Sequence, residues 1–373
     1  MKILITSNSV FSIVNYRLDL ILSIQKLGHK VYLLAPDIEK ENFLKEKGFI
    51  LYNLPLWRTS VNILKENITF FAMFKKIFSI KPDLILSFTI KNNLYGSIIS
   101  MYLRIPFIPN ITGLGNLFYE PNVLAYIIKK ILGISFKNCP VVFCQNPDDG
   151  NYYKKGIVNP NRVTVLPGSG IDLTKFLPVI KPIDKKKLTF IMISRLLINK
   201  GIYEYVYAAK EIKKIFPNYK FYLLGPKDTL GKSSLTDNQL ESITRDGIVE
   251  YLGETKNVRD FISMADCIVL PSYYREGTPR VLIEAASMGK PIITTNVPGC
   301  KEVVQHNQNG FLCKPRNKDN LKKIIMTFAE LDLEKIKNMG SESRLLAEKK
   351  YDQNIIIDIY KKYIQTVYDQ KNN

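Results

Sequence analysis

Histidine is scarce in this sequence of 373 residues, which contains only His29 and His306. Two histidines cannot build a His-rich metal site, and they leave a Ser-His triad almost without a candidate base. The pattern Asp-x-Asp does not occur either, so the usual pair of carboxylates that holds a metal against a diphosphate is missing. We therefore expect no cofactor and no bound metal ion.

Long apolar runs are also missing. No window reaches about 18 uninterrupted apolar residues, and the N-terminus MKILITSNS begins a strand rather than a signal peptide. The five cysteines have no metal-ligand spacing, and several lie in apolar strand-like runs: Cys139, Cys144, Cys267, Cys300 and Cys313. These features predict a cytoplasmic protein with buried, reduced thiols and no membrane-spanning segment.

Motifs of several other enzyme classes are absent. The stretch TGLGNLF has Gly113 and Gly115 but lacks the third glycine of a dinucleotide fingerprint. The sequence contains neither the phosphate-binding loop of nucleotide hydrolases nor a nucleophile elbow. A nicotinamide enzyme, a nucleotide hydrolase and an α/β-hydrolase are therefore disfavoured.

Apolar strand-like runs alternate with helical stretches along the whole chain, which is 46% hydrophobic and 23% charged. This alternation predicts an α/β fold with two doubly wound parallel sheets, each covered on both faces. The runs are MKILITS, KVYLLAP, LILSF, PFIPNI, VVFCQN and VTVLPG in the first half, and TFIMIS, KFYLLGP, VEYLG, CIVLPS and PIITT in the second. The Lys-rich stretch 178–187 suggests domains 1–178 and 179–350, followed by an amphipathic helix over 351–373.

Residues 276–285, EGTPRVLIEA, are the most informative segment. They follow the strand-like run CIVLPS, and the sequence predicts a helix with Thr278 as its N-cap and Pro279 at its first position. Glu276 then precedes the helix, and Glu284 points off it about 7 Å further along. The free amides of the helix start lie between the two carboxylates. A carboxylate, an anion site and a second carboxylate suit a ligand with hydroxyls, a diphosphate and hydroxyls, such as a sugar nucleotide.

A second strand-like run, within 189–201, is followed by Arg195 and Lys200 and by a helix that opens at Gly201. Strand ends of doubly wound sheets converge where ligands bind, so both cations are candidates to face the same anion. Arginine binds a diphosphate by its planar fork and lysine as a point charge. Because Arg195 and Lys200 follow a strand and lie outside the core, we expect folding to survive the loss of either side chain.

The formal net charge of +19 points to an anionic partner. Residues 61–140 include nine basic and three acidic residues. Lysines alternate with apolar residues in two stretches of this segment, FFAMFKKIFSIKP and VLAYIIKKILGISFK. This pattern is typical of helices on an anionic membrane surface, with the pairs Lys75–Lys76 and Lys129–Lys130 reaching the headgroups. Helices that face the core and expose a lysine face are the alternative. Nucleic acid is disfavoured, because no recognition module is visible.

Several segments together resemble the family 4 glycosyltransferases. They are NYRLDL, TIKNNLYGS, NITGLGNLF, FCQNPDD, LPGSGIDLTKF, SRLLINKG, LLGP, YLGET, REGTPRVLIEA and TTNVPGC, spread over nearly the whole chain. Within the family, the chain looks closest to bacterial enzymes of surface-polysaccharide and glycan assembly. The resemblance implies the GT-B fold, with two Rossmann-like domains facing across a cleft and the last helix packing back on the first domain.

The activity implied by the resemblance is retaining transfer of a sugar from a UDP-sugar to a lipid-diphosphate-linked glycan, at the inner face of the cytoplasmic membrane. The UDP-sugar is then a substrate and not a cofactor. Glu276 would hold hydroxyls of the donor sugar, and Glu284 those of the ribose. The expected donor-binding residues are Arg195, Lys200, Glu276, Gly277, Thr278, Pro279, Arg280 and Glu284.

The first domain would hold the acceptor, because polar residues, including Asn93, follow its strand-like runs. The expected acceptor-binding residues are Asn15, Arg17, Lys91, Gly113 and Gly115. Arg17 and Lys91 suit an acceptor diphosphate, and Lys91 joins Glu276 as a candidate catalytic residue. Some relatives have a histidine where this chain has Ile90, so the base that activates the acceptor stays open.

Two other functions remain possible at this stage. A UDP-sugar 2-epimerase has the same architecture, but it would have no use for a cationic, apolar surface on the first domain. A donor-binding protein without catalysis would not need polar groups on the acceptor side. Incubation with UDP-sugars alone separates them, because only the epimerase would convert the sugar.

Overall fold

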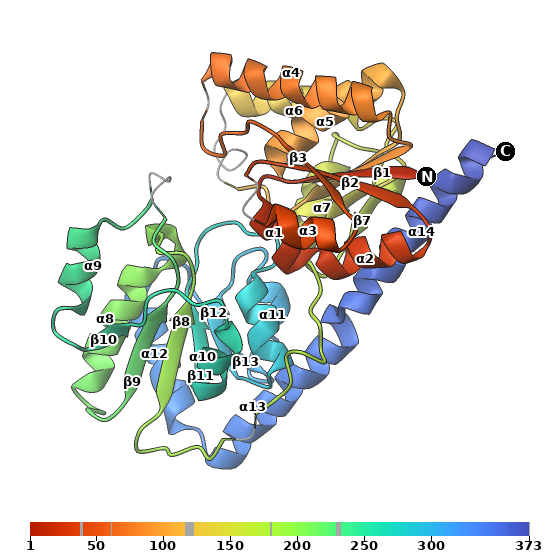
Figure 1. Ribbon diagram of the computed structural model, residues 1–373. Helices are drawn as coiled ribbons and strands as arrows, with labels where there is room; N and C mark the ends of the chain where they lie inside the picture. Colours follow the sequence, from red (N-terminus) through yellow and green to blue (C-terminus); the bar gives the residue numbers. More distant parts are fainter. Residues whose placement is uncertain (38–39, 61, 116–122, 180, 229–232, 373) are drawn as a thin grey trace. The chain divides into compact units, whose positions relative to one another are not determined.

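The computed structural model describes residues 1–37, 40–60, 62–115, 123–179, 181–228 and 233–372. The chain divides into two compact units, residues 1–170 with 353–373, and residues 171–352. Each unit contains one parallel sheet with helices on both faces, which confirms the predicted α/β fold of two doubly wound domains (Figure 1).

The sheet of the first unit has the order β3-β2-β1-β4-β5-β6-β7. Its strands are β1 (Lys2–Thr6), β2 (Lys30–Ala35), β3 (Ile50–Asn53), β4 (Leu84–Phe88), β5 (Phe107–Ile111), β6 (Val142–Cys144) and β7 (Val163–Val165). The helices are α1 (Val10–Tyr16), α2 (Leu18–Lys26), α3 (Glu41–Glu46), α4 (Ile63–Ile80), α5 (Ile90–Leu103), α6 (Val123–Ser135), α7 (Pro147–Lys154) and α14 (Gln353–Asn372). The six strand-like runs predicted for this half all form strands, and β3 is an additional strand at the sheet edge.

Side chains that alternate along each strand fill two separate cores, one on each face of this sheet. Ile3 and Ile5 pack toward α1, α2, α3 and α14, whereas Leu4 packs toward α4, α5 and α6. Figure 1 shows these two helix layers on opposite sides of the strands. Burial on both faces explains why the central strands are apolar throughout.

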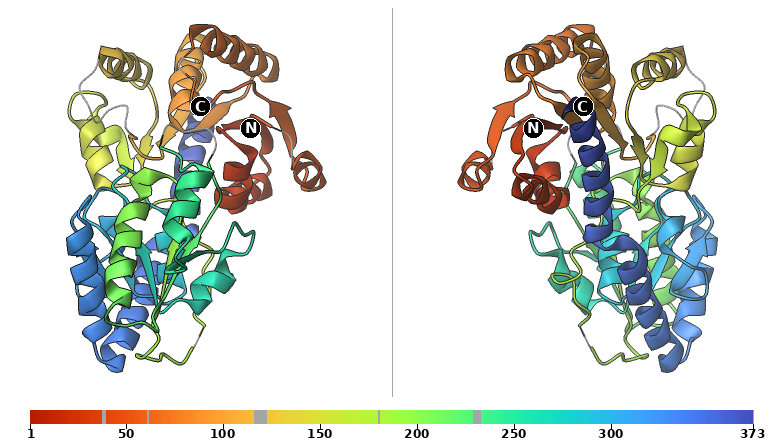
Figure 2. Two further views of the ribbon diagram at one scale, coloured as in Figure 1. Left: turned by 90° about the vertical axis from the view of Figure 1, so that its left-hand side faces the viewer. Right: turned by 90° about the vertical axis from the view of Figure 1, so that its right-hand side faces the viewer.

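Helix α14 completes the core of the first unit, although it comes from the far end of the chain. Ile356, Ile357, Tyr360, Ile364 and Val367 are buried in the core that also contains Ile3 and Ile5. The helix lies alongside α2 (Figure 2). The Tyr360 ring packs 4.7 Å from that of Phe143, and Asn110 Nδ2 donates a hydrogen bond to the Tyr360 hydroxyl at 2.7 Å.

The sheet of the second unit has the order β10-β9-β8-β11-β12-β13. Its strands are β8 (Thr189–Ile193), β9 (Lys220–Leu224), β10 (Val249–Tyr251), β11 (Cys267–Leu270), β12 (Ile292–Thr295) and β13 (Gly310–Cys313). Its α-helices are α8 (Ile202–Lys213), α9 (Asp237–Thr244), α10 (Val258–Met264), α11 (Arg280–Ser287), α12 (Lys318–Glu330) and α13 (Leu333–Leu346), and short helical turns η2 (Ile198–Lys200), η3 (Lys301–Val303) and η4 (Ala347–Tyr351) occur between them.

The boundary between the units falls at Gly170–Ile171, before the predicted joint at 178. The segment after Gly170 already belongs to the second unit, because Ile171 is buried in its core and Lys181 pairs with Asp266 at 3.0 Å. The chain returns to the first unit at Gln353, two residues after the predicted start of the last helix. None of the described helices is both long enough and apolar enough to cross a membrane.

Truncation of Tyr360 tests how strongly the first unit depends on α14. We expect Tyr360→Ala to cost about 3–5 kcal/mol of unfolding free energy, because it removes a buried aromatic ring from the core. Tyr368→Ala removes a ring that is 40% exposed from the same helix and should cost less than about 1 kcal/mol. Urea unfolding of both variants measures the difference, and equal small losses would show that α14 does not stabilise this unit.

Candidate functional site

Close packing of two strand ends builds the candidate site of the second unit. Gly201 follows η2 at the end of β8, has a φ of 83°, and would place any Cβ against the carbonyl oxygen of Pro271 after β11. A side chain there is excluded both by the left-handed backbone and by the contact. Tyr273 N also donates a hydrogen bond to Asn199 O at 3.0 Å. The loop that carries Lys200 is thereby held against the loop that carries Glu276.

Lys200 and Glu276 form an ion pair at this junction. Lys200 Nζ lies 2.5 Å from Glu276 Oε1, and Ser272 Oγ donates a hydrogen bond to the same oxygen at 3.0 Å. Burial, together with the nearby Glu276 carboxylate, raises the pKa of the neighbouring Tyr274 hydroxyl. The structure thus brings together two residues that the sequence assigned separately, one to the diphosphate and one to the donor sugar.

The expected location of Lys200 outside the core is wrong. Only 7% of this residue is exposed, because η2 turns its side chain inward beneath the loop of Glu276. Removal of its charge would leave the Glu276 carboxylate without this partner in a largely buried position. The residue therefore contributes to folding as well as to any ligand site.

The loop of Glu276 is also held from its other side. Gly299 has a φ of 89°, and a Cβ there would overlap the carbonyl oxygens of Glu276 and Gly277. Glu302 Oε2 accepts a hydrogen bond from Gly299 N at 2.6 Å. Sequence reasoning did not assign Ser272, Gly299 or Glu302, although the motif TTNVPGC marked the second loop.

Helix α11 starts one residue later than predicted. Pro279 is its N-cap, with a ψ of 121° that is extended rather than helical, so Thr278 lies before the cap. The free amides of the helix start still follow Glu276 closely in the chain, and they offer donors to an anion.

Glu284 packs against its own helix rather than pointing away from it. Arg280 Nε lies 3.2 Å from Glu284 Oε1, and both side chains are mostly buried. Burial raises the pKa of the Glu284 carboxyl, and Arg280 opposes that rise. A mostly buried carboxylate that retains one cationic partner is suited to accept hydrogen bonds from hydroxyl groups.

Arg195 is the exposed cation of the predicted donor set, with 54% of its side chain accessible. Its guanidinium pairs with Asp228 at 2.6 Å. Gly225 makes this possible, because a Cβ there would collide with Ser194 O and separate the ends of β8 and β9. Arg195 is the more available of the two predicted diphosphate ligands, since about half of its side chain is exposed whereas Lys200 is buried.

In the first unit, the Lys91 ammonium is surrounded by three oxygen atoms that accept its hydrogen bonds. Its Nζ lies 2.7 Å from Trp57 O, 2.5 Å from Ser60 O and 2.7 Å from Glu66 Oε1. All three donors of the ammonium are therefore used, and they join the start of α5 to α4. An acceptor diphosphate would have to displace one of these partners, so the acceptor and catalytic roles of Lys91 stay predictions.

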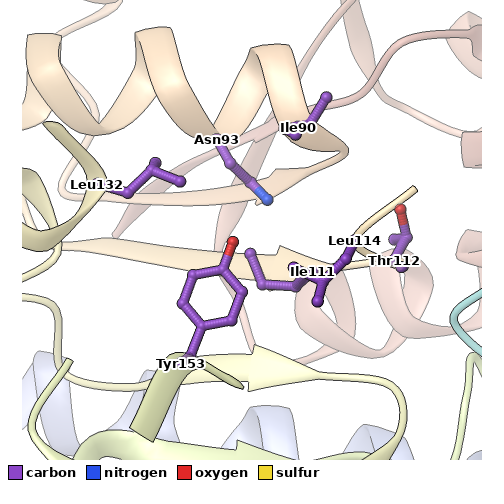
Figure 3. A pocket seen from close by; sticks show the side chains of 8 residues that line it. Ile90, Asn93, Ile111, Thr112, Leu114, Leu132 and Tyr153 are labelled. Atoms are coloured by element: carbon purple, nitrogen blue, oxygen red, sulfur yellow. The ribbon is translucent and has the colours of Figure 1, made fainter. Parts of the chain in front are cut away.

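The other predicted acceptor residues are dispersed. Arg17 is buried, with its guanidinium carbon 4.0 Å from the centre of the Phe88 ring, and it donates a hydrogen bond to Ser12 Oγ at 2.8 Å. Asn15 is exposed and donates to Phe11 O within its own helix. Gly113 and Gly115 both have positive φ and lie in the loop after β5. Gly113 in this loop lines a hollow in the first unit (Figure 3).

Helices α4 and α6 expose apolar stripes directly opposite their buried faces. On α4 the stripe consists of Leu64, Ile68, Phe71, Lys75 and Phe78, and on α6 of Val123, Ile127, Lys130 and Ile134. Their spacing of three and four residues places each set on one face of its helix. Phe71 is 66% exposed and Ile134 is 63% exposed. Each stripe contains a single lysine near its middle.

The other lysine of each predicted pair, Lys76 on α4 and Lys129 on α6, lies outside the exposed stripe. Lys76 Nζ lies 4.5 Å from the centre of the Tyr52 ring, and Lys129 Nζ lies 5.2 Å from that of Tyr152. Only Lys75 and Lys130 therefore belong to the exposed stripes. Among the described residues, no group of three or more His, Cys, Asp or Glu side chains could hold a metal ion.

Two family models match the chain. The model described as "Glycosyl transferases group 1" matches residues 174–345, and the model described as "Glycosyl transferase 4-like" matches residues 2–146. Together they cover most of both units.

Two bacterial transferases are similar over much of their length. The N,N'-diacetylbacillosaminyl-diphospho-undecaprenol alpha-1,3-N-acetylgalactosaminyltransferase of Campylobacter jejuni is 26% identical over 386 residues, covering 98% of this chain and 99% of the relative. The UDP-Gal:alpha-D-GlcNAc-diphosphoundecaprenol alpha-1,3-galactosyltransferase of Escherichia coli is 24% identical over 304 residues, covering 78% and 76%.

Solved structures share the fold. HepE from Anabaena, determined in complex with UDP, superimposes with a TM-score of 0.77 at 18% identity and covers 98% of this chain and 100% of its own. A sucrose-phosphate synthase from Thermosynechococcus elongatus superimposes with a TM-score of 0.80 at 17% identity, covering 99% and 100%. Both matches confirm the two-domain architecture.

The double variant Lys200→Met, Glu276→Gln separates the structural role of the ion pair from its chemical role. Lys200→Met alone should cost about 3–5 kcal/mol of unfolding free energy, because it removes a cationic partner from a mostly buried carboxylate. The double variant should recover much of that loss, since the buried carboxylate is neutralised together with the ammonium, and it should still lack activity.

The exposed pair Arg245–Glu241 provides the control, and Arg245→Met there should cost less than about 1 kcal/mol. Urea unfolding and a transfer assay measure both properties. A double variant that is no more stable than Lys200→Met would rule out the ion pair as the source of the loss.

Proposed function

The chain belongs to the glycosyltransferases with the GT-B fold, and we propose that it moves a sugar from a UDP-sugar to a glycan carried on a polyprenyl diphosphate. We further propose retention of the anomeric configuration, no requirement for a metal ion, and attachment to the inner face of the cytoplasmic membrane. Retention rests on the family resemblance alone.

The observation that carries the donor assignment is the ion pair of Lys200 and Glu276 at 2.5 Å, just before the start of α11. The Lys200 ammonium has three N–H donors, and within the described part of the chain Glu276 is its one hydrogen-bonding partner. Two donors are therefore available to a diphosphate while the ion pair persists.

Departure of UDP places negative charge on the diphosphate while positive charge develops on the sugar. Lys200, Arg195 and the first amides of α11 would stabilise the leaving diphosphate, and together they would do the work of a metal ion. Glu276 would hold sugar hydroxyls next to the reacting carbon. Glu284, eight residues further along the chain, would accept hydrogen bonds from the ribose hydroxyls.

The acceptor assignment is supported by the relatives. The names of the Campylobacter and Escherichia enzymes both give a sugar on undecaprenyl diphosphate as acceptor, and the second gives a UDP-sugar as donor. The epimerase alternative is not favoured, because the matched models and these relatives are transferases. A donor-binding protein without catalysis is disfavoured for the same reason.

The apolar stripes of α4 and α6 support membrane attachment. Exposed side chains such as Phe71 and Ile134 would enter the boundary between headgroups and acyl chains, while Lys75 and Lys130 pair with anionic headgroups. Both helices belong to the unit proposed to bind the acceptor. The same unit would therefore bind the membrane and the sugar of an acceptor whose lipid lies in that membrane.

A panel of donors tests the proposed reaction. Each of several UDP-sugars is incubated with a short isoprenyl diphosphate carrying one sugar, and products are identified by mass spectrometry. We expect one donor to add one hexose or N-acetylhexosamine, with equal yield in EDTA. Epimerised donor without transfer would overturn the proposed function, and loss of activity in EDTA with rescue by Mn²⁺ would overturn the metal-free mechanism.

Neutral replacements of the two glutamates test the division of the donor site. Glu284→Gln should weaken UDP binding about 10- to 100-fold, because the hydroxyls lose a charged acceptor. Glu276→Gln should bind UDP at least as tightly as the wild type, since Lys200 is released toward the diphosphate, and it should lose turnover. Calorimetry with UDP measures both affinities, and an equal loss in the two variants would contradict the assignment.

Charge reversal on the stripes tests membrane attachment. Lys75→Glu with Lys130→Glu should weaken binding to anionic phospholipid vesicles by about 2 kcal/mol or more, roughly 30-fold, because each lysine near the surface contributes about 1 kcal/mol. Added salt should weaken binding of the wild type as well.

The matched control, Lys26→Glu with Lys45→Glu, changes the charge equally on α2 and α3, which cover the opposite face of the same sheet. It should bind vesicles nearly as the wild type does. Equal losses in both double variants would mean that only the net charge matters, and no binding by the wild type at low salt would remove membrane attachment.

A further inference from the structure

Residues 57–60 form a mostly exposed loop before α4, and this loop contains the only tryptophan of the chain. Trp57 is 37% exposed, and Ile63, the first residue of α4, is 77% exposed. The two lie close together, because Lys65 on the first turn of α4 places its Nζ 5.4 Å from the centre of the Trp57 ring. Exposed large apolar side chains that gather in this way mark a surface that a partner covers.

The charge of this segment identifies the kind of partner. Residues 57–65, WRTSVNILK, include two basic residues and no acidic one. Both basic residues, Arg58 and Lys65, are exposed. A tryptophan, exposed aliphatic residues and cations side by side are typical of protein segments at the surface of an anionic membrane.

The segment also continues the apolar stripes of α4 and α6 to one edge of the sheet. Both helices follow strands of a parallel sheet, so both begin at its carboxyl edge. The most exposed large apolar residue of each helix is its first residue, Ile63 on α4 and Val123 on α6. The exposed apolar surface therefore extends to the edge where ligands bind to doubly wound sheets.

Loop 57–60 is bonded directly to Lys91 at this edge. The Lys91 ammonium donates hydrogen bonds to Trp57 O at 2.7 Å and to Ser60 O at 2.5 Å. Its third partner is Glu66 Oε1 at 2.7 Å, and only 17% of the lysine side chain is exposed. The depth of the loop in a membrane would therefore fix the depth of the Lys91 ammonium.

The diphosphate of a lipid-linked acceptor has a fixed depth as well. Its charge keeps it out of the hydrocarbon layer, while the attached chain remains inside, so the diphosphate lies at the level of the headgroups. Tryptophan rings prefer the same level. With Trp57 there, Lys91 would lie at the depth of the acceptor diphosphate.

The contacts of Lys91 allow a diphosphate to bind without loss of the whole network. Trp57 O and Ser60 O are neutral acceptors, whereas phosphate oxygens are charged and form stronger hydrogen bonds with an ammonium. The other oxygen of Glu66 accepts a hydrogen bond from the Tyr95 hydroxyl at 2.5 Å. Glu66 is thus held between α4 and α5, and it would keep Lys91 in place while phosphate oxygens replace the two carbonyls.

We propose that loop 57–60 and the first turn of α4 enter the headgroup layer of an anionic membrane, and that they bring Lys91 to the diphosphate of a lipid-linked acceptor. The inference rests on the proposed function, which supplies both the membrane and the diphosphate. It adds an orientation, with the starts of α4 and α6 deeper in the membrane than their ends.

Fluorescence of Trp57 tests the membrane contact directly, because no other tryptophan contributes to the emission. Vesicles of phosphatidylcholine and phosphatidylglycerol should shift the emission to shorter wavelength, and lipids brominated near the headgroup should quench it. Sedimentation measures vesicle binding in parallel.

The outcomes of this experiment separate the inference from the proposed function. Vesicle binding without a shift would overturn the inference and leave the proposed membrane attachment intact, whereas no vesicle binding would overturn both. A shift that needs no vesicles and grows with protein concentration would mean that a second copy of the chain covers this surface, and it would also overturn the inference.

Trp57→Ala tests the contact in the reaction. Two acceptors are compared, a sugar on a long polyprenyl diphosphate in the same vesicles and a sugar on a short, water-soluble isoprenyl diphosphate. We expect the ratio of kcat/KM for the vesicle-bound acceptor to that for the soluble one to fall about tenfold, because a large apolar ring is lost from the membrane contact.

Phe43→Ala is the matched control. Phe43 is also 37% exposed and has a lysine near its ring, with Lys47 Nζ 4.9 Å from the centre, but it lies on α3 at the opposite face of the sheet. Its loss should leave the ratio unchanged. An equal fall in both variants, or no fall in Trp57→Ala, would overturn the inference. Failure of the wild type to use either acceptor, with the Trp57 shift intact, would instead count against the proposed transfer.

Vesicle affinity tests the role of Lys91 without turnover. The wild type should bind vesicles that contain a polyprenyl diphosphate about tenfold more tightly than vesicles of equal charge without it, and Lys91→Gln should remove this preference. The Trp57 shift on plain vesicles should persist in Lys91→Gln, which also shows that the variant folds. Equal binding of both vesicles by the wild type, or a preference that survives in Lys91→Gln, would overturn the role given to Lys91.

Discussion

In the second unit of this glycosyltransferase, the loops of the candidate site depend on the short ion pair between Lys200 and Glu276. The pair exists because two glycines allow backbones to meet: Gly201 against Pro271, and Gly299 against the loop of Glu276. Lys200 is buried on a helical turn, and the Glu276 carboxylate also accepts a hydrogen bond from Ser272. Both side chains therefore have few conformations available. The same charges that fix the loop are those that would bind the diphosphate and the sugar, so folding and donor binding draw on one interaction.

The first unit combines two surfaces with different chemistry. Its carboxyl edge carries a strained turn at Thr89 and a small hollow lined by Asn93, whose Oδ1 has no hydrogen-bond partner within the described chain. Helices α4 and α6 expose stripes such as that around Phe71, which suit a membrane. Both surfaces are built on one sheet, whose core is completed by α14 from the end of the chain. The substrate that we propose, with a sugar at one end and a lipid at the other, would contact this unit through both its sugar and its lipid.

Much of the fold could be predicted from the sequence, because central parallel strands are continuous apolar runs such as LILSF and CIVLPS. Strands β3 and β13 were missed, since ILYN and GFLC at the sheet edges are short and carry weak signals. Of the site, the charged residues could be identified, but their partners could not. The burial of Lys200 and the enclosure of Lys91 by Trp57, Ser60 and Glu66 depend on contacts between segments distant in sequence. Spacing alone also cannot decide whether Pro279 or Thr278 caps α11.

A crystal structure with an intact UDP-sugar tests the central claim most directly. The account predicts that Lys200 Nζ lies about 3 Å from a diphosphate oxygen, while the Glu276 carboxylate accepts hydrogen bonds from hydroxyls of the donor sugar. A nucleotide bound away from the start of α11, with Lys200 hydrogen-bonded to Glu276 and to no phosphate oxygen, would contradict it. That result would leave the ion pair a purely structural contact.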